Sequence, residues 1–320
     1  MSETKNLNYS TAILLVGYKR LDFLIKRISE LEKNFRLPII ISIDGNSDYE
    51  TANVIRHYLD DYTKINPDIS LTYKIQDTNL GLAKHINFAI SEALSEYNQV
   101  IVLEDDVVVA KNFIKAMLSG FELAKNQADI GVIGGFSLYK DSLTFSRSAL
   151  WRKSKYFSAW GWGINSENWE KFILVLPNNF QNSLEKSNTW NSLSSYRKKM
   201  WINRFKKVDN DNPPTWDYQM QYFLFRYNLR MLLTTRRISD NEGFESHLST
   251  NTVGIRPKWM GPLETSENEV ISRISRTSWL YEIGDAFTFG GDSRIFHRMA
   301  KIRKTLSVFL FDGTNAKLPD

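Results

Sequence analysis

The sequence predicts an α/β fold with a mostly parallel central sheet, helices on both faces of the sheet and a mixed C-terminal extension. The first observation is that apolar runs alternate with amphipathic helical patterns over roughly the first half of the chain. The second is that polar or glycine-containing segments follow these runs directly, where parallel sheets bind ligands. The third is the length of 320 residues, which allows two domains, or one large α/β domain with an extension.

Five short apolar runs are predicted to be strands of this sheet. The first, Thr11–Gly17, is rich in Leu, Ile and Val and ends at a glycine, and the second, 38–45, ends in Asp-Gly. Runs of this length that end in turn residues are typical of buried strands. The other predicted strands are 70–76, 99–106 and 130–137.

Amphipathic stretches separate these runs and are predicted to be helices. In residues 20–34 the apolar side chains recur at helical spacing, which places them on one face. The other predicted helices are 49–62, 81–94 and 112–126. Because a helix links each strand to the next, we expect the strands to run parallel.

The alternation ends after Ser137, where the chain becomes rich in Trp, Tyr and Phe. Residues 215–228 are predicted to form a helix with Thr215 as its N-cap. Residues 229–235 are compatible with one more strand. Near the C-terminus, residues 293–311 carry an apolar stripe at helical spacing with basic residues beside it, which predicts a basic amphipathic helix.

The amino-acid composition excludes some kinds of chemistry and favours certain ligands. The chain is 42% hydrophobic and 24% charged, which is ordinary for a globular protein, and it contains no cysteine, which excludes disulfides and thiolate chemistry. The N-terminus shows no apolar signal region, so we expect a cytoplasmic protein. The net charge of +5 suits phosphate-bearing ligands, nucleic acid or an anionic membrane surface.

Three consecutive acids, Glu104, Asp105 and Asp106, interrupt an apolar stretch. Burying an unpaired carboxylate is costly, so these acids need a partner. Successive side chains of a strand point to opposite faces, so the chain must turn here for two acids to reach one site. A short acidic cluster at a strand end suits Mn²⁺ or Mg²⁺ that arrives with a diphosphate. Capping of the helix that begins near Asn112 is a weaker alternative, because the acids lie too far upstream.

The order of these motifs resembles the GT-A fold glycosyltransferases, which transfer sugars from nucleotide diphosphates. It is similar to the N-acetylglucosaminyltransferase I family and to related bacterial family-two-like sugar transferases, and the likeness spans about residues 13 to 250. The resemblance implies a Rossmann-like sheet. It also implies that Asp106 binds the metal, Asp105 the ribose and Glu104 the donor sugar.

The same resemblance assigns three further donor contacts. Arg20, after the first strand, would face the phosphates, and its guanidinium fork suits them. Asp44 and His85 would bind the nucleotide base. From the residues alone, Arg20 is equally compatible with the first turn of its helix, Asp44-Gly45 with a turn, and His85 with a partly buried structural histidine.

Two aromatic segments of the second half are candidate acceptor-site elements. Trp160, Gly161 and Trp162 combine indole faces, which stack on sugars, with a glycine that permits close approach, although core packing explains such clusters equally well. Trp216 precedes Asp217, and the resemblance makes Asp217 the general base. The helix dipole alone also favours an acid in the first turn, and it should lower the pKa of Asp217 while keeping it ionised.

A loosely spaced arrangement of Asn241, Gly243 and His247 follows the last predicted strand. By resemblance, His247 would be a second metal ligand or a phosphate contact. The implied mechanism is inversion, in which Asp217 takes the proton of an acceptor hydroxyl. A retaining mechanism would not need this base and stays open.

We therefore predict a catalytic domain over residues 1–250, with a nucleotide-binding half at about 10–137 and an acceptor half at about 138–250, and an extension over 251–320. The expected partners are a nucleotide-sugar donor, UDP-sugar first, and a glycan or lipid-linked acceptor in bacterial surface polysaccharide assembly. We expect no nucleic acid; the basic helix docks on the body or on the inner face of a membrane. The alternatives are a sugar-phosphate nucleotidyltransferase and a non-catalytic basic binding protein.

Overall fold

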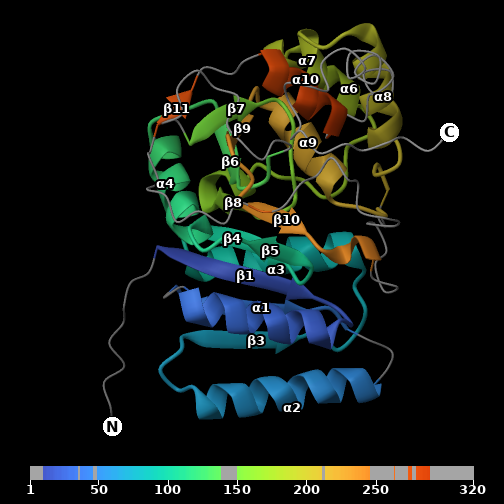
Figure 1. Cartoon of the computed structure of the whole chain (residues 1–320). Coiled ribbons are helices and arrows are strands. Elements are labelled where there is room, and N and C mark those ends of the chain that lie inside the picture. Colours follow the sequence, from blue (N-terminus) through green and yellow to red (C-terminus); the bar gives the residue numbers. More distant parts are fainter. Residues whose placement is uncertain are drawn as a thin grey trace, which may run out of the picture.

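The computed structural model describes residues 10–34, 37–45, 49–137, 150–210, 213–245, 263, 273–275 and 279–288. The predicted basic helix at 293–311 and His247 lie outside the described residues. Figure 1 shows the strands and helices of residues 11–75 in the lower part of the molecule and the helices of residues 180–205 and 279–288 in its upper part.

A nine-stranded sheet forms the centre of the molecule, in the order β11-β7-β9-β6-β8-β4-β1-β2-β3. Its first half is parallel, because β1 pairs with both β2 and β4, and β2 pairs with β3. These strands are β1 (Thr11–Gly17), β2 (Ile39–Ile43), β3 (Leu71–Ile75) and β4 (Gln99–Glu104). The fold class predicted from the sequence, an α/β fold with a mostly parallel central sheet, is confirmed.

The second half of the sheet is mixed. The strand β8 runs antiparallel between β4 and β6, whereas β9 is parallel to β6 and antiparallel to β7. A short strand, β11, pairs in parallel with β7 at the edge. These strands are β6 (Ile130–Gly134), β7 (Trp151–Ser154), β8 (Trp162–Asn165), β9 (Arg230–Thr234) and β11 (Ile274–Ser275). The sequence prediction missed β7, β8 and β11.

Helices cover both faces of the sheet, and β1 shows why. Its alternate residues Ile13 and Leu15 pack in one core with α1, α2 and α4, while Leu14 and Val16 pack in a second core with α3 and α9. The helices are α1 (Leu21–Asn34), α2 (Tyr49–Ile65), α3 (Leu82–Glu96), α4 (Phe113–Lys125) and α9 (Asp217–Arg226).

A third, aromatic-rich core lies among the helices of the second half. Phe205 of α8 and Phe225 of α9 are fully buried there, and Ala286 of α10 packs with them. The elements are α6 (Phe180–Glu185), α7 (Asn188–Asn191), α8 (Ser195–Phe205) and α10 (Trp279–Thr288), with α5 (Ser166–Trp169) beside β8. None of the described helices is long and apolar enough to cross a membrane.

The predicted N-cap of the helix at 215–228 is wrong. The helix α9 begins at Asp217, and its N-cap is Trp216, which makes no side-chain capping bond. The Thr215 hydroxyl instead donates a hydrogen bond to the carboxylate of Asp217. Thr215 therefore hydrogen-bonds the candidate base, Asp217, and does not cap the helix.

Candidate functional site

The carboxyl ends of β1, β2 and β4 meet at one edge of the sheet. Gly17 of β1 lies beside Ile43 of β2, and Val16 lies beside Glu104 of β4. The residues that follow these strands are Arg20, Asp44 and the pair Asp105-Asp106. The register therefore brings the polar strand ends of the sequence analysis to one edge, which is where open α/β sheets bind ligands.

The chain turns within the acidic motif. Asp105 and Asp106 form a turn after β4, and the chain continues into β5 (Val107–Val109). The backbone N–H of Asp105 donates to the carbonyl of Val16 at 3.0 Å, which fixes the turn against β1. Both aspartates are at most 5% exposed. The turn needed for neighbouring acids to reach one site is thus present, and both carboxylates need compensating partners.

Arg20 supplies the positive partner for both aspartates. Its Nε donates to Oδ2 of Asp105 at 3.2 Å and its Nη1 to Oδ2 of Asp106 at 2.9 Å, while Nη2 bonds the other oxygen of Asp105. Burial lowers the pKa of Arg20, but the two carboxylates outweigh this, so its pKa is raised. Arg20 therefore stays protonated and balances part of the negative charge of the motif.

A short strand from the second half holds the motif from the other side. The strand β10 (Ser239–Asn241) pairs antiparallel with β5. The amide of Asn241 donates to Oδ1 of Asp106 at 3.0 Å, and the backbone N–H of Glu242 donates to the Asp106 carbonyl at 2.9 Å. A Cβ at Gly243 would lie 2.5 Å from Oδ2 of Asp106, so a side chain here would displace the carboxylate. The spacing of Asn241 and Gly243 was the available signal in the sequence, and it predicted no role for Asn241.

The surroundings of Glu104 and Asp105 favour the protonated forms of these two acids. Burial raises the pKa of Glu104 to about 8, with further upward contributions from the charges of Asp106, Asp105 and Asp217 and a downward one from Arg20. Burial also raises the pKa of Asp105 to about 6, although Arg20 opposes this. A positive charge placed beside these carboxyls would favour their ionised forms.

Ionisation of the buried Glu104 carboxyl should lower the free energy of unfolding as the pH rises. A carboxyl with a raised folded-state pKa binds a proton in the folded chain that the unfolded chain has already lost, so the free energy of unfolding falls with pH from about 4.5 to 8. Glu104→Gln cannot ionise, and we expect its free energy of unfolding to fall less over this window. Urea unfolding at pH 5, 6.5 and 8 in EDTA would measure the difference. Glu96→Gln, an exposed change on α3, is the control; equal pH slopes for wild type and Glu104→Gln would contradict the prediction.

Asp217 faces the same region as Glu104, because its charge contributes to the raised pKa of Glu104. It lies in the first turn of α9, where its carboxylate accepts the hydrogen bond from Thr215. Burial raises the pKa of Asp217, and the hydrogen bonds from Thr215 and nearby backbone only partly offset this. The expectation that the helix dipole would lower this pKa is therefore wrong, and a raised pKa makes Asp217 a stronger base.

Asp44 and His85 have structural partners. The carboxylate of Asp44 accepts hydrogen bonds from the backbone N–H groups of Gly45, Leu80 and Gly81 at 2.9 to 3.0 Å, which ties β2 to the start of α3. His85 is 2% exposed, its Nε2 lies 2.9 Å from the Ser42 hydroxyl, and burial lowers its pKa. Both residues thus shape the same sheet edge, and their predicted contacts with a base stay predictions.

The candidate sugar-stacking residues separate into two groups. Trp162 is fully buried and Trp216 is 3% exposed, and their rings stack on each other with centroids 5.2 Å apart. Trp162 and Trp216 are therefore core residues, because their stacked rings are shielded from solvent. Trp160 is only half-buried, with its ring against Phe136 and Phe244, and Gly161 has a φ of 72°, which favours glycine. Trp160 is the remaining stacking candidate.

The acids present suit Mn²⁺ or Mg²⁺. Asp106 accepts one hydrogen bond on each oxygen, and a carboxylate has about four acceptor positions, so it has capacity for a cation. No group of three or more His, Asp or Glu side chains converges as a complete cage in the described part of the chain. The donor set therefore fits a cation that takes its other ligands from a diphosphate and water. His247, predicted as a second ligand, lies outside the described residues.

The chain is similar to one protein family and to several solved structures. The family model described as glycosyl transferase family 2 matches residues 13–233. Mannose-1-phosphate geranyltransferase from Thermus thermophilus is 11% identical with a TM-score of 0.41, over 73% of this chain and 77% of that one. The 4-diphosphocytidyl-2C-methyl-D-erythritolsynthase from Anaerococcus prevotii is 9% identical with a TM-score of 0.34, over 70% and 88%. No curated protein matches.

These likenesses carry different weight. The family match spans more than half of the chain and supports the GT-A fold predicted from the sequence. The two solved structures are too distant to carry an argument about activity. The resemblance to the N-acetylglucosaminyltransferase I family stays a hypothesis.

Proposed function

Because the chain belongs to glycosyl transferase family 2, we propose that it is a metal-dependent, inverting glycosyltransferase. It moves a sugar from a nucleotide diphosphate, UDP first, to a hydroxyl of a glycan or a lipid-linked acceptor. The observation that carries the proposal is the joint placement of Asp106, Arg20 and Asp217. A cation ligand, a phosphate-binding cation and a base with a raised pKa surround one edge of the sheet.

Each residue has a role that its surroundings support. Asp106, oriented by Asn241 and the backbone of Glu242, holds the cation, and Asp105 and Glu104 contact the ribose and the sugar. Bound Mn²⁺ or Mg²⁺ would neutralise charge on the diphosphate. Arg20, which now bonds both aspartates, turns its guanidinium to the phosphate oxygens and stabilises the departing nucleotide.

Asp217 performs the proton transfer. Its carboxylate accepts the proton of the acceptor hydroxyl while the hydroxyl oxygen bonds to the anomeric carbon and the bond from that carbon to the diphosphate breaks. Thr215 orients this carboxylate, and the Trp160 ring offers a face for the acceptor sugar. Bacterial surface polysaccharide assembly stays the expected setting.

A product assay separates this proposal from its alternatives. Full-length protein with Mn²⁺ is incubated with UDP-, GDP- and dTDP-sugars, and separately with nucleoside triphosphates and sugar phosphates. A glycosyltransferase releases nucleoside diphosphate from one nucleotide sugar, whereas a nucleotidyltransferase releases pyrophosphate from a triphosphate. Pyrophosphate release would overturn the proposal in favour of the nucleotidyltransferase. Binding of RNA with no turnover of any donor would favour the non-catalytic basic binding protein.

A further inference from the structure

A buried arginine of α1 bonds the two-stranded ribbon that lies beside Asp106. The ribbon consists of β5 and β10, and Asn241 of β10 lies opposite Val107 of β5. Val107 directly follows Asp106 in the chain, and Glu242 directly follows Asn241. The Arg27 guanidinium donates to the Val107 carbonyl at 3.4 Å and to the Glu242 carboxylate at 2.9 Å. Arg27 therefore bonds both sides of the ribbon at the end nearest Asp106.

Arg27 is the buried cation of a small ionic cluster. Its side chain is 1% exposed, whereas that of Lys26, which bonds the other carboxylate oxygen of Glu242 at 2.6 Å, is 52% exposed. Glu30 also pairs with the Arg27 guanidinium, at 2.5 Å, and holds it at the surface of α1. An exposed ion pair contributes little because water and salt screen it, but breaking a buried pair is costly. The pair of Arg27 and Glu242 therefore fixes the ribbon against α1.

The helix α1 contacts the acidic motif at two levels. Arg20 stands at its start, and Arg27 follows seven residues later, which is about two turns and therefore the same side of a helix. Arg20 bonds the Asp106 carboxylate directly, at 2.9 Å. Arg27 reaches Asp106 through the ribbon. The backbone N–H of Glu242 donates to the Asp106 carbonyl at 2.9 Å, and the amide of Asn241 donates to its Oδ1 at 3.0 Å.

These two levels differ in what a bound donor would do to them. In the proposed function Arg20 turns to the phosphate oxygens, so its bond to Asp106 is lost. The ribbon then orients Asp106, and Arg27 holds the ribbon. Groups that hydrogen-bond a metal ligand from behind fix its orientation and strengthen metal binding.

We propose that Arg27 is a positioning residue for cation binding. Through Glu242 it holds the ribbon where Asn241 can orient the Asp106 carboxylate. The proposal rests on the proposed function for the identity of the ligand, which is Mn²⁺ with a nucleoside diphosphate. Anchoring of the ribbon by Arg27 is measurable without any ligand, so the two proposals can fail separately.

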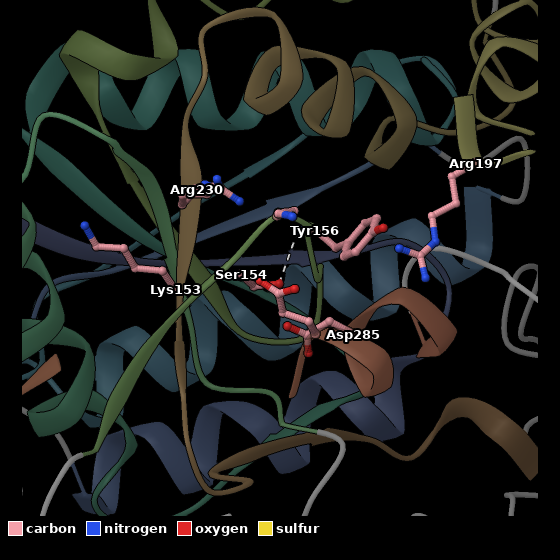
Figure 2. A pocket seen from close by; sticks show the side chains of 8 residues that line it. Lys153, Ser154, Tyr156, Arg197, Arg230 and Asp285 are labelled. Atoms are coloured by element: carbon pink, nitrogen blue, oxygen red, sulfur yellow. Dashed lines mark hydrogen bonds between the residues drawn. The ribbon is translucent and has the colours of Figure 1, made fainter. Parts of the chain in front are cut away.

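Arg152 provides a matched control, because it is a second buried arginine with a carboxylate partner. Its side chain is fully buried and bonds both oxygens of Asp285, at 2.5 and 2.7 Å. Arg152 lies in β7, and β9, β6 and β8 separate this strand from β4. Figure 2 shows Asp285 and Ser154 of β7 among the residues that line a hollow there. Loss of this pair should lower stability without reaching the acidic motif.

Amide hydrogen exchange of the full-length protein in EDTA tests the anchoring. Arg27→Met should lose protection in the ribbon, whereas Arg152→Met should lose it in β7 and keep it in the ribbon. Arg27→Lys, which retains the charge, should keep part of the protection. Thermal melts verify folding, and Glu242→Gln, which keeps the backbone N–H that bonds Asp106, gives the same comparison if Arg27→Met does not fold. Unchanged protection of the ribbon in the folded variant overturns the proposal.

Binding of Mn²⁺, followed by electron paramagnetic resonance with UDP present and with GDP and dTDP in parallel, tests the effect on the cation. Arg27→Met should weaken Mn²⁺ binding by about 10- to 100-fold, the usual effect of losing a group behind a metal ligand, while Arg152→Met leaves it unchanged. Adding Glu242→Gln to Arg27→Met should weaken binding no further, because both changes break one interaction. Wild-type Mn²⁺ affinity in Arg27→Met, or equal weakening in Arg152→Met, overturns the positioning role.

Failure of the proposed function gives a different result. Wild-type protein that binds no Mn²⁺ with any of the three nucleotides overturns that function, and with it the role of Arg27 in cation binding. The exchange experiment in EDTA still decides whether Arg27 anchors the ribbon, because it needs no ligand.

Discussion

Asp106→Ala is expected to abolish sugar transfer and to weaken UDP binding mainly when Mn²⁺ is present. Asp106 is the acid that β10 orients, through the amide of Asn241 at 3.0 Å, and it has acceptor capacity for a cation. Losing the cation removes several kcal/mol of charge stabilisation at the diphosphate, which corresponds to roughly a thousandfold or more in rate. Turnover of the preferred nucleotide sugar and calorimetric UDP binding, each with Mn²⁺ and with EDTA, would measure both effects.

The comparison with and without metal distinguishes metal binding from general damage to the site. Asp61→Ala, on the exposed face of α2, removes the same side chain far from the sheet edge and should leave both readouts unchanged. Circular dichroism and thermal melts verify that Asp106→Ala folds, since Arg20 keeps its bonds to Asp105. If wild-type protein binds UDP equally in EDTA and the variant turns over normally, Asp106 does not bind a metal.

Local patterns were sufficient for the first half of the fold. The strand β1 was predicted with the bounds that the structure shows, because seven consecutive buried residues end at a glycine. Its parallel neighbours follow from the helices between them. In contrast, β10 consists of Ser239, Asp240 and Asn241, and these polar residues are buried where they pair with β5. Nothing local in Ser-Asp-Asn predicts a strand, so the sequence did not reveal that this segment orients Asp106.

The site shows the same division between local and distant causes. The sequence identified the acidic motif of Glu104, Asp105 and Asp106 because burying carboxylates in an apolar run is costly unless they have a binding partner. Arg20 can bond both aspartates because β1 and β4 are neighbours in the sheet. The pairing of these strands decides this, and the residue types alone do not. Trp162 and Trp216 were candidates for a sugar pocket, with core packing left open for Trp162, because an exposed and a buried indole have the same sequence pattern. Their mutual stacking is visible only in three dimensions.

Asp217→Asn is expected to lower kcat by about 10²- to 10⁴-fold, the usual contribution of general-base catalysis, while the affinity for UDP barely changes. Asparagine keeps the size of the side chain, but it cannot accept the proton of the acceptor hydroxyl. Because burial raises the pKa of Asp217, the acid limb of the kcat–pH profile should lie above the usual range of an aspartate. This limb should disappear in the variant, which a structural role for Asp217 would not predict.

Thr215→Ala provides the graded comparison for this assignment. Removing the hydroxyl takes away a hydrogen bond that lowers the pKa of Asp217, so the acid limb should move to higher pH while the base is retained. The loss in kcat should therefore be smaller than in Asp217→Asn. The two variants together distinguish two roles of Asp217, a general base and an acid that only stabilises the helix terminus. Only a general base would make the pH dependence of turnover sensitive to the hydrogen bond from Thr215. Full kcat in Asp217→Asn, or a loss of UDP affinity equal to the loss of kcat, would show that Asp217 stabilises the start of α9 and takes no proton.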